Sequence, residues 1–331
     1  MSVNALDIAP VDPELEDRLG RRLHEVEKGL VAAADSEAPF ITEAARHLLE
    51  AGGKRFRPLL VLLGAEFGDA EAPGVVPAAL VVELTHVATL HHDDVMDEAE
   101  LRRGALSANA RWDNSVAILT GDWLFARASD IVADLGPEAV RIQARTFLRL
   151  VQGQIRETLG VRLGDDPLEH YLSVVADKTG SLIATSALFG AKLSGAPEAT
   201  QEALFGFGER IGTAFQLADD IIDVTSDTGE SGKTPGTDLR EGIPTLPALF
   251  ALQSSDPADA QLQQLLRADL SDEALHAQAL SLLRNHVAVD SARAFVAGRA
   301  DEARAYLRQL PDIAARDALS ALCDLVVTRS G

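Results

Sequence analysis

The sequence predicts an all-α protein, and three features point to this class. Apolar residues recur at i, i+3, i+4 and i+7 in long segments such as 15–34 and 140–159, which is the period of an amphipathic helix. Alternation of apolar and polar residues, the pattern of a half-buried strand, is nearly absent. Clusters of Gly, Pro, Asp and Ser cut the chain into pieces of ordinary helix length. We therefore predict about ten or more helices in a single large bundle with a central cavity.

The predicted helices follow one another between recognisable breaks. Residues 15–34 form the first helix, and residues 1–35 carry no recognisable motif. The later breaks are SEAP at 36–39, GDAEAPG at 68–74, LGPE at 135–138, GDDP at 164–167, SGAPEA at 194–199 and SSDPAD at 254–259. No linker, internal repeat or low-complexity tract divides the remainder. We expect residues 1–35 to form an N-terminal segment with the first helix, and residues 36–331 to form the main domain.

Composition excludes several classes of protein. The 331 residues are 47% hydrophobic, enough for a large core, and the net charge of −21 repels nucleic acid and anionic membrane surfaces. Glu83 and His86 interrupt the most apolar stretch, so we expect no transmembrane segment. The start of the chain lacks the basic and apolar regions of a secretory signal, which predicts a cytoplasmic location. Cys323 is the only cysteine, which excludes internal disulfides and multi-cysteine metal sites.

Two segments, 75–96 and 204–224, are more apolar than the rest and are predicted to be central helices. Each ends in a DDxxD motif; the aspartates are Asp93, Asp94 and Asp97 in the first motif and Asp219, Asp220 and Asp223 in the second. The first and fifth positions of such a motif lie one turn apart on one face of a helix. Carboxylates stacked at a helix C-terminus repel each other and oppose the helix dipole unless a cation compensates them. Oxygen ligands of this kind suit Mg²⁺, which completes its coordination with water and phosphate.

One acidic helix end alone is often just a solvated surface, but a second copy at the same spacing disfavours that interpretation. Two such motifs facing one another across a cavity could hold several Mg²⁺ ions and clamp one diphosphate. Cations accompany them in the sequence: Lys54, Arg55, Arg57, Arg102, Arg103, Lys178 and Lys233. Guanidinium and ammonium groups near an acidic metal site indicate a second anion. The site is therefore predicted to bind two anionic groups.

Six motifs together resemble those of the trans-isoprenyl diphosphate synthases of the polyprenyl synthetase family. They are GGKRFRP at 52–58, ELTHVATLHHDDVMDEAELRRG at 83–104, GDWLFARA at 121–128, DKTGSLIATS at 177–186, FQLADDIIDVTSD at 215–227 and GKTPGTDLREGIPTLP at 232–247. The resemblance implies the isoprenoid synthase type of helical fold, with residues 36–331 as the catalytic domain. It implies a Mg²⁺-dependent prenyltransferase, with roughly three ions per active site, that condenses isopentenyl diphosphate with an allylic diphosphate head to tail in the trans configuration. It also implies a homodimer.

The resemblance further implies a role for each motif position. Mg²⁺ would be bound by Asp93, Asp97 and Asp219, while Asp94, Asp220 and Asp223 complete the motifs; these six aspartates and Lys178 form the predicted catalytic set. The allylic diphosphate would be contacted by Arg102, Lys178, Thr179, Gln216 and Lys233. Isopentenyl diphosphate would be bound by Lys54, Arg57, His86 and Arg103. His91 and His92 adjoin the aspartates and are interpreted as supporting residues rather than ligands.

Residues just before the first motif predict the length of the product. In the family that the chain resembles, side chains four and five residues before the first aspartate form the floor of a product tunnel; here they are Thr89 and Ala88. Both are small and leave the tunnel open, which predicts a medium-to-long polyprenyl diphosphate of about six to ten isoprene units. The alternative is a short farnesyl or geranylgeranyl product, with another helix supplying the floor.

Two other functions share part of this pattern. A class I terpene cyclase also ionises diphosphates, but it normally replaces the second DDxxD motif and does not need Lys54, Arg57 and Arg103. A non-catalytic subunit of a two-component synthase would be expected to lose aspartates from one motif, whereas this sequence retains all six. Both remain less favoured alternatives.

Overall fold

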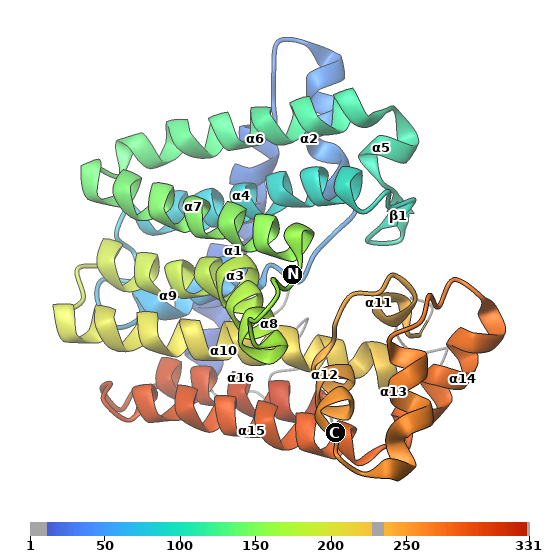
Figure 1. Cartoon of the computed structure of the whole chain (residues 1–331). Helices are drawn as coiled ribbons and strands as arrows, with labels where there is room; N and C mark the ends of the chain where they lie inside the picture. Colours follow the sequence, from blue (N-terminus) through green and yellow to red (C-terminus); the bar gives the residue numbers. More distant parts are fainter. Residues whose placement is uncertain (1–11, 227–234, 330–331) are drawn as a thin grey trace. The chain divides into compact units, whose positions relative to one another are not determined.

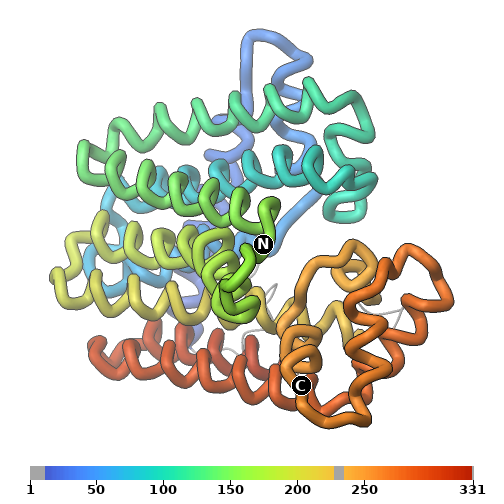
Figure 2. The backbone as a smooth tube through the Cα atoms, in the orientation of Figure 1, coloured from blue at the N-terminus to red at the C-terminus, as the bar shows by residue number. Residues whose placement is uncertain are grey.

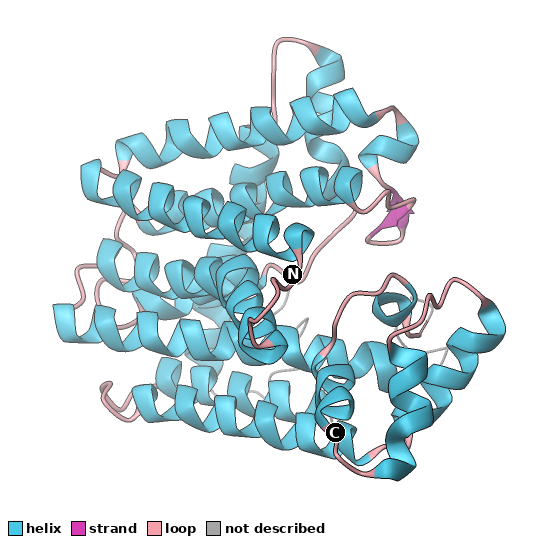
Figure 3. Ribbon diagram, viewed as in Figure 1, coloured by secondary structure: helices cyan, strands magenta, loops and turns pink. Residues whose placement is uncertain are grey.

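The described chain is built almost entirely from helices (Figure 1; cyan in Figure 3). The computed structural model describes residues 12–226 and 235–329. The α-helices in these ranges are α1 (Pro13–Ala33), α2 (Pro39–Glu50), α3 (Phe56–Ala65), α4 (Val75–Met96), α5 (Ala108–Arg111), α6 (Asn114–Asp134), α7 (Pro137–Leu159), α8 (Pro167–Val175), α9 (Ser181–Leu193), α10 (Glu198–Thr225), α11 (Thr237–Arg240), α12 (Leu246–Gln253), α13 (Ala260–Leu266), α14 (Glu273–Arg284), α15 (Val287–Leu307) and α16 (Ala314–Arg329). The remaining elements are the strands β1 (Leu101–Arg102) and β2 (Ala105–Leu106), a π-helical turn (Ala176–Gly180) and a 3-10 turn (Pro257–Asp259). The predicted all-α class is confirmed.

Local sequence explains where several helices begin. The side chain of Asp12 accepts the N–H of Leu15 at 2.8 Å, and Pro13 occupies the first position of α1. Asp113 and Asp166 cap α6 and α8 in the same way. An aspartate at this position satisfies an N–H group that the start of a helix leaves without an intrahelical partner.

The predicted boundaries agree closely with the observed ones in several places. The first central helix was expected at 75–96, and α4 spans Val75–Met96. The second central helix was expected at 204–224 but begins earlier. Its counterpart, α10, starts at Glu198, directly after Pro197. The antiparallel hairpin of β1 and β2 (magenta in Figure 3) was not predicted, since strands of two residues are too short to show alternation.

The chain divides into two compact units. The first contains residues up to Leu148 together with Leu182–Gly208 and Tyr306–Ala321, and the second contains Arg149–Ser181, Glu209–Ala305 and the residues from Leu322 onward. The chain passes from one unit to the other several times. Figure 2 traces the backbone from blue at the N-terminus to red at the C-terminus. The prediction of one main domain over residues 36–331 stays a prediction.

In the first unit, α4 packs against α6, α3 and α1. Apart from Arg57, every residue of α3 is buried, which suits its apolar sequence. The backbones of α3 and α9 approach each other so closely that a Cβ at Gly190 would lie 2.0 Å from the carbonyl oxygen of Val61. Only glycine permits this approach. The packing holds α3, and the basic loop that precedes it, beside α4.

Among the described helices, α4 is also the one long and apolar enough to cross a membrane. However, 61% of its most apolar window is buried inside the fold. The core helix of a globular protein passes the same test of length and hydropathy, so α4 is only a weak candidate for a membrane span.

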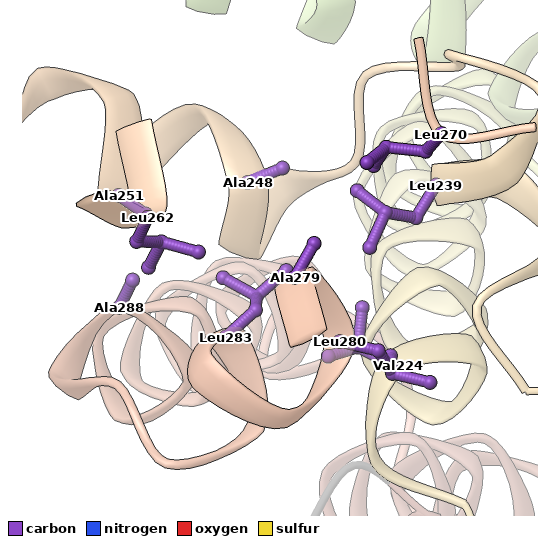
Figure 4. Packing of buried hydrophobic residues seen from close by; sticks show 10 residues of the cluster. All are labelled: Val224, Leu239, Ala248, Ala251, Leu262, Leu270, Ala279, Leu280, Leu283 and Ala288. Atoms are coloured by element: carbon purple, nitrogen blue, oxygen red, sulfur yellow. The ribbon is translucent and has the colours of Figure 1, made fainter. Parts of the chain in front are cut away.

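In the second unit, an apolar cluster includes the C-terminal end of α10 at one edge (Figure 4). Val224 of α10 lies beside Leu280 of α14, and Leu239 of α11 belongs to the same cluster. Its other members are Ala248, Ala251, Leu262, Leu270, Ala279, Leu283 and Ala288. Because Val224 directly follows Asp223, this packing fixes the helix end that carries the second aspartate motif.

Cys323 is fully buried on α16 within the second unit. Burial raises the pKa of its thiol to about 12. The thiol is therefore un-ionised at neutral pH and is a poor nucleophile.

Candidate active site

The first aspartate motif lies at the C-terminal end of α4, in the first unit. Asp94 is fully buried, whereas Asp93 is half-buried and Asp97 is exposed. The N–H of Asp97 donates to the carbonyl oxygen of Asp93 at 2.8 Å, which places the two residues on successive turns of one helix face. The accessible carboxylates are thus the two that were predicted to bind Mg²⁺.

The buried aspartate of this motif is held by the hairpin that follows α4. Nε of Arg102 donates to Oδ1 of Asp94 at 2.6 Å, while Oδ2 has no hydrogen-bond partner within the described residues. Burial raises the pKa of Asp94 above its usual value, and the guanidinium of Arg102 opposes this rise. Arg102, predicted to contact the allylic diphosphate, is therefore anchored next to the motif.

The basic loop at residues 52–55 turns sharply before α3. Gly52, Gly53 and Arg55 have φ angles of 100°, 156° and 50°. A Cβ at Gly53 would lie 2.9 Å from Nη1 of Arg55 and 3.1 Å from Cζ of Arg103. A side chain here would displace the two guanidinium groups, and the φ of Gly53 also favours glycine. The structure therefore brings together two basic segments that are distant in sequence.

Arg57 and His86, both half-buried, are two further residues of the predicted isopentenyl diphosphate pocket. Burial lowers the pKa of Arg57 to about 10, although the carboxylate of Glu83 opposes this fall. Burial also lowers the pKa of His86 well below its usual value, and the Arg57 cation adds to the effect. His86 is consequently neutral at pH 7. Lys54, the fourth predicted residue of this pocket, is exposed.

The two predicted floor residues lie on α4, before the aspartates. Ala88 is fully buried, and the hydroxyl of half-buried Thr89 donates to the carbonyl oxygen of His86 at 2.8 Å. The role of both in product length stays a prediction.

The neighbouring histidines differ from each other. His91 is fully buried, neither of its ring nitrogens has a hydrogen-bond partner within the described residues, and burial lowers its pKa to about 3. His92 contacts α6 instead: its Nε2 lies 3.1 Å from the carbonyl oxygen of Ile118 and 3.4 Å from a carboxylate oxygen of Asp122. That His91 and His92 support the site rather than bind a ligand stays an interpretation.

The second aspartate motif ends α10 in the second unit and repeats the pattern of burial. Asp220 is 5% exposed, whereas Asp219 and Asp223 are half-buried. The hydroxyl of buried Tyr171 donates to Oδ2 of Asp220, and Nε2 of Gln216 donates to its Oδ1 at 3.1 Å. Burial raises the pKa of Asp220 to about 8, even though both of these donors favour the ionised form.

The other two aspartates of this motif have separate partners. Asp219 accepts a hydrogen bond from Nη2 of Arg329, on α16, at 3.0 Å. Asp223 accepts the backbone N–H groups of Thr237 and Asp238 at 3.3 Å, so its carboxylate lies at the start of α11. Asp223 thus helps to hold α11 against the end of α10.

The predicted allylic diphosphate contacts of this unit lie around the π-helical turn. Thr179 donates from Oγ1 to Oε1 of Gln216 at 3.2 Å, which continues the hydrogen-bond chain from Asp220. Nζ of Lys178 donates to Oε2 of Glu157 on α7 at 2.5 Å, with both side chains about one-third exposed. An ion pair this accessible is weak enough to be exchanged for a diphosphate. Lys233 lies outside the described residues.

The accessible carboxylates of each motif are of the kind that Mg²⁺ prefers. Asp93 in the first unit and Asp219 in the second are half-buried, and Asp97 in the first unit is exposed, so each presents carboxylate oxygens to solvent. Mg²⁺ typically takes one or two carboxylates and completes its shell with water and substrate phosphate. Over residues 12–226 and 235–329, no group of three or more His, Cys, Asp or Glu side chains is arranged to hold a metal ion by itself.

Several residues that contact the predicted site have no role that the sequence alone predicts. They are Glu27 and Glu83 in the first unit, and Glu157, Tyr171 and Arg329 in the second. Glu83 had a detectable signal, because it is the only acid in the apolar stretch 75–92. Nothing in the local sequence marks the other four, whose partners lie far away along the chain.

Comparison with known proteins identifies the family. The model of the polyprenyl synthetase family matches residues 38–283. The chain belongs to the polyprenyl synthetase family. It is 52% identical to the nonaprenyl diphosphate synthase of Mycobacterium tuberculosis over 292 residues, which cover 88% of this chain and 87% of that protein.

Solved structures of this family have the same fold. The geranylgeranyl pyrophosphate synthase of Corynebacterium glutamicum, complexed with calcium and isoprenyl diphosphate, has a TM-score of 0.88 and 46% identity over 97% of this chain and 98% of that one. The decaprenyl diphosphate synthase of Rhodobacter capsulatus also has a TM-score of 0.88, with 34% identity over 96% and 99% of the two chains. These matches confirm the predicted family, the isoprenoid synthase fold and the enzyme class, a prenyltransferase.

Proposed function

We propose that this polyprenyl synthetase condenses isopentenyl diphosphate with an allylic diphosphate, head to tail and in the trans configuration, in a Mg²⁺-dependent reaction. The observation that carries the proposal is the shared design of the two aspartate motifs. In each, the second aspartate is buried and held by protein donors, while the first is accessible at a helix end. An accessible carboxylate on a rigid support is what binding a substrate-linked cation requires.

The residues of the chain then have distinct tasks. Asp93, Asp97 and Asp219 hold Mg²⁺, about three ions per site, and Arg102, Lys178, Thr179, Gln216 and Lys233 bind the allylic diphosphate. Mg²⁺, when bound, stabilises the negative charge that develops on the departing pyrophosphate. Lys54, Arg57, His86 and Arg103 hold isopentenyl diphosphate so that its alkene attacks the allylic cation. Loss of a proton to the released pyrophosphate then leaves an allylic diphosphate one isoprene unit longer.

His86 has a defined chemical state in this scheme. Its lowered pKa keeps it neutral at pH 7, so it offers one N–H donor and adds no positive charge to the four arginines nearby. The positive charge that binds the diphosphate of isopentenyl diphosphate thus comes from Lys54, Arg57 and Arg103.

A direct assay tests the proposal. Purified protein is incubated with Mg²⁺, isopentenyl diphosphate and either farnesyl or geranylgeranyl diphosphate, and the products are separated by chromatography. We expect elongated polyprenyl diphosphates. A cyclised hydrocarbon would instead identify a terpene cyclase, and turnover that depends on an added protein would identify one subunit of a two-component synthase.

We propose a medium-to-long product of about six to ten isoprene units, as the small residues Ala88 and Thr89 suggest. The nonaprenyl and decaprenyl relatives support this length, whereas the geranylgeranyl relative leaves a short product as the alternative. Ala88→Phe should shorten the product. The readout is the distribution of chain lengths, which does not depend on the fraction of protein that folds. An unchanged distribution would show that the floor lies elsewhere.

A homodimer is proposed from an exposed apolar stripe on α7. Val151, Ile155 and Leu159 follow each other at intervals of four residues and are 39%, 52% and 66% exposed. Exposed apolar side chains at helical spacing are typical of a helix that packs against a partner. Light scattering should give twice the chain mass, and Ile155→Asp should shift the protein toward monomer.

We also propose a cytoplasmic location, because both substrates of the proposed reaction are charged. Cell fractionation tests this location. Recovery of the protein in the membrane fraction would contradict it.

A further inference from the structure

A buried carboxylate lies among the arginines of the basic loop. Glu83 of α4 is 2% exposed, and its Oε1 lies 3.0 Å from Nη1 of Arg55 and 4.0 Å from Nη2 of Arg103. Its charge also acts on Arg57, whose protonated form it favours. Glu83 thus compensates part of the charge of three neighbouring guanidinium groups that would otherwise repel one another.

The three arginines are not equivalent. Arg55 is 5% exposed, and its hydrogen bonds all go to the protein: Nε and Nη2 donate to Glu27 at 2.6 and 3.2 Å, Nη1 donates to Glu83, and Nη2 also donates to the carbonyl oxygen of Leu49 at 2.9 Å. Nε of Arg57, in contrast, has no hydrogen-bond partner within the described residues. Arg55 is therefore engaged by the protein, while Arg57 retains a donor for a ligand.

The backbone of Arg55 shows how strongly these contacts constrain the loop. Its φ of 50° lies in the left-handed region, which a residue with a side chain adopts at a cost in strain. Such a conformation persists when surrounding interactions specify it. Here Glu83 and Glu27 provide those interactions, and Arg55 in turn is the N-cap of α3, two residues before Arg57.

We propose that Glu83 is a positioning residue for isopentenyl diphosphate: through Arg55 and Arg103 it sets where the guanidinium groups of the pocket lie. The inference deepens the proposed function and rests on it, because it assumes that Arg57 and Arg103 bind this substrate. Glu83 itself does not touch the diphosphate, since two anionic groups would repel each other.

The sign of a mutational effect separates this role from a purely electrostatic one. If Glu83 only lowered the positive potential of the pocket, then its neutralisation would strengthen the binding of a diphosphate. If Glu83 positions the arginines, then neutralisation weakens binding, because the guanidinium groups lose the partner that holds them in place.

The experiment compares KM values for the two substrates in Glu83→Gln and in the unmodified protein. We expect the KM for isopentenyl diphosphate to rise about ten-fold or more, with the KM for the allylic substrate changed by less than about two-fold. A KM for isopentenyl diphosphate that is unchanged or lower would overturn the proposal. A fall in kcat together with similar rises in both KM values would also overturn it, because that pattern indicates general damage to the protein.

Two further variants make the test decisive. Arg55→Lys keeps the charge but loses the fork that bridges Glu27 and Glu83, so it should raise the same KM, by a smaller factor. If Glu83→Gln fails to fold, Arg55→Lys becomes the test variant. An unaltered KM for isopentenyl diphosphate in Arg55→Lys would then overturn the proposal. The matched control is Glu66→Gln, which breaks another carboxylate pair of the first unit, with Arg18 at 2.6 Å, and should leave both KM values unchanged.

Failure of the proposed function would look different from failure of this inference. If the unmodified protein elongates no allylic diphosphate, the proposed function is wrong. If it does elongate one and Glu83→Gln has a normal KM for isopentenyl diphosphate, only the positioning role is wrong. Calorimetric titration of the unmodified protein and Glu83→Gln with isopentenyl diphosphate alone measures the same difference without turnover.

Discussion

The two aspartate motifs have the same sequence pattern but are stabilised by opposite kinds of partner. In the first unit, the buried Asp94 is paired with the cation of Arg102, whereas in the second unit the buried Asp220 is held by the neutral donors Tyr171 and Gln216. A cation offsets most of the cost of burying a carboxylate, but neutral donors offset less of it. Accordingly, the pKa of Asp220 is raised to about 8, and that of Asp94 is raised against the opposing effect of Arg102. One motif thus contains a buried ion pair, and the other contains a carboxyl that is protonated at neutral pH when no metal is bound.

The largest expected effect tests what the motifs share. Asp93→Ala and Asp219→Ala should each lower turnover by roughly two orders of magnitude or more, because each removes a carboxylate proposed to hold Mg²⁺. Both side chains are partly accessible, so folding should be little affected. Steady-state kinetics and thermal unfolding measure the two effects. Asp130→Ala, which removes an exposed aspartate of α6, is the control, and near-normal turnover in both motif variants would remove the metal assignment.

The next effect tests how the motifs differ. Asp94→Asn leaves the guanidinium of Arg102 without its ionic partner and should lower the free energy of unfolding by about 2 kcal/mol. Asp220→Asn removes a carboxyl that must take up a proton when the chain folds at pH 7, so the free energy of unfolding should stay the same or rise. Chemical denaturation of the metal-free proteins measures both. If the two variants lost the same free energy of unfolding, the hydrogen-bond partners of the two aspartates would not determine how each affects stability.

The pH dependence of stability sharpens the same contrast. Because the folded-state pKa of Asp220 is raised, its contribution is fully present below the unfolded value of 3.8 and is lost as the pH rises through about 8. The metal-free protein should therefore lose stability as the pH rises from about 4 to about 8. The Asp220→Asn variant should lose less stability over the same pH range. Melting temperatures measured in chelator at several pH values test this; identical slopes for the two proteins would contradict it.

The smallest expected effect concerns Arg329, which pairs with Asp219 of the second motif. Its ion pair with Asp219 is partly exposed, so Arg329 competes only weakly with a metal ion for that carboxylate. Arg329→Ala should lower the Mg²⁺ concentration for half-maximal activity by about two-fold. Arg316→Ala, on the same helix but paired with Asp312, is the control. A higher Mg²⁺ requirement in Arg329→Ala would indicate that this residue assists binding instead.

Local signals predicted the elements of the fold well. The apolar run and its flanking breaks placed the first central helix at 75–96, and α4 has those bounds. The hairpin at Leu101–Leu106 left no such signal, since it is formed by two pairs of residues. Its contribution to the candidate site is nonetheless large, because it places Arg102 against Asp94 and Arg103 beside the basic loop.

The candidate site was predictable only in part, for a physical reason. Motif spacing identifies groups on one helix turn, such as Asp93 and Asp97, because the geometry of a helix is local. The partner of a buried group depends on tertiary packing. Tyr171 lies 49 residues from Asp220, and Arg329 lies 110 residues from Asp219, so neither could be paired from the sequence alone. Glu83 is intermediate: a lone acid in an apolar helix indicates a buried partner but does not identify it.

The enclosed thiol of Cys323 has a practical consequence. The native protein should be inert toward maleimide dyes at pH 7, because its single cysteine is both buried and un-ionised. A cysteine introduced at the exposed Leu101, beside the first motif, would then be the one position labelled without removing the native residue. A fluorophore there would follow the arrival of each substrate in real time, in an otherwise unmodified enzyme.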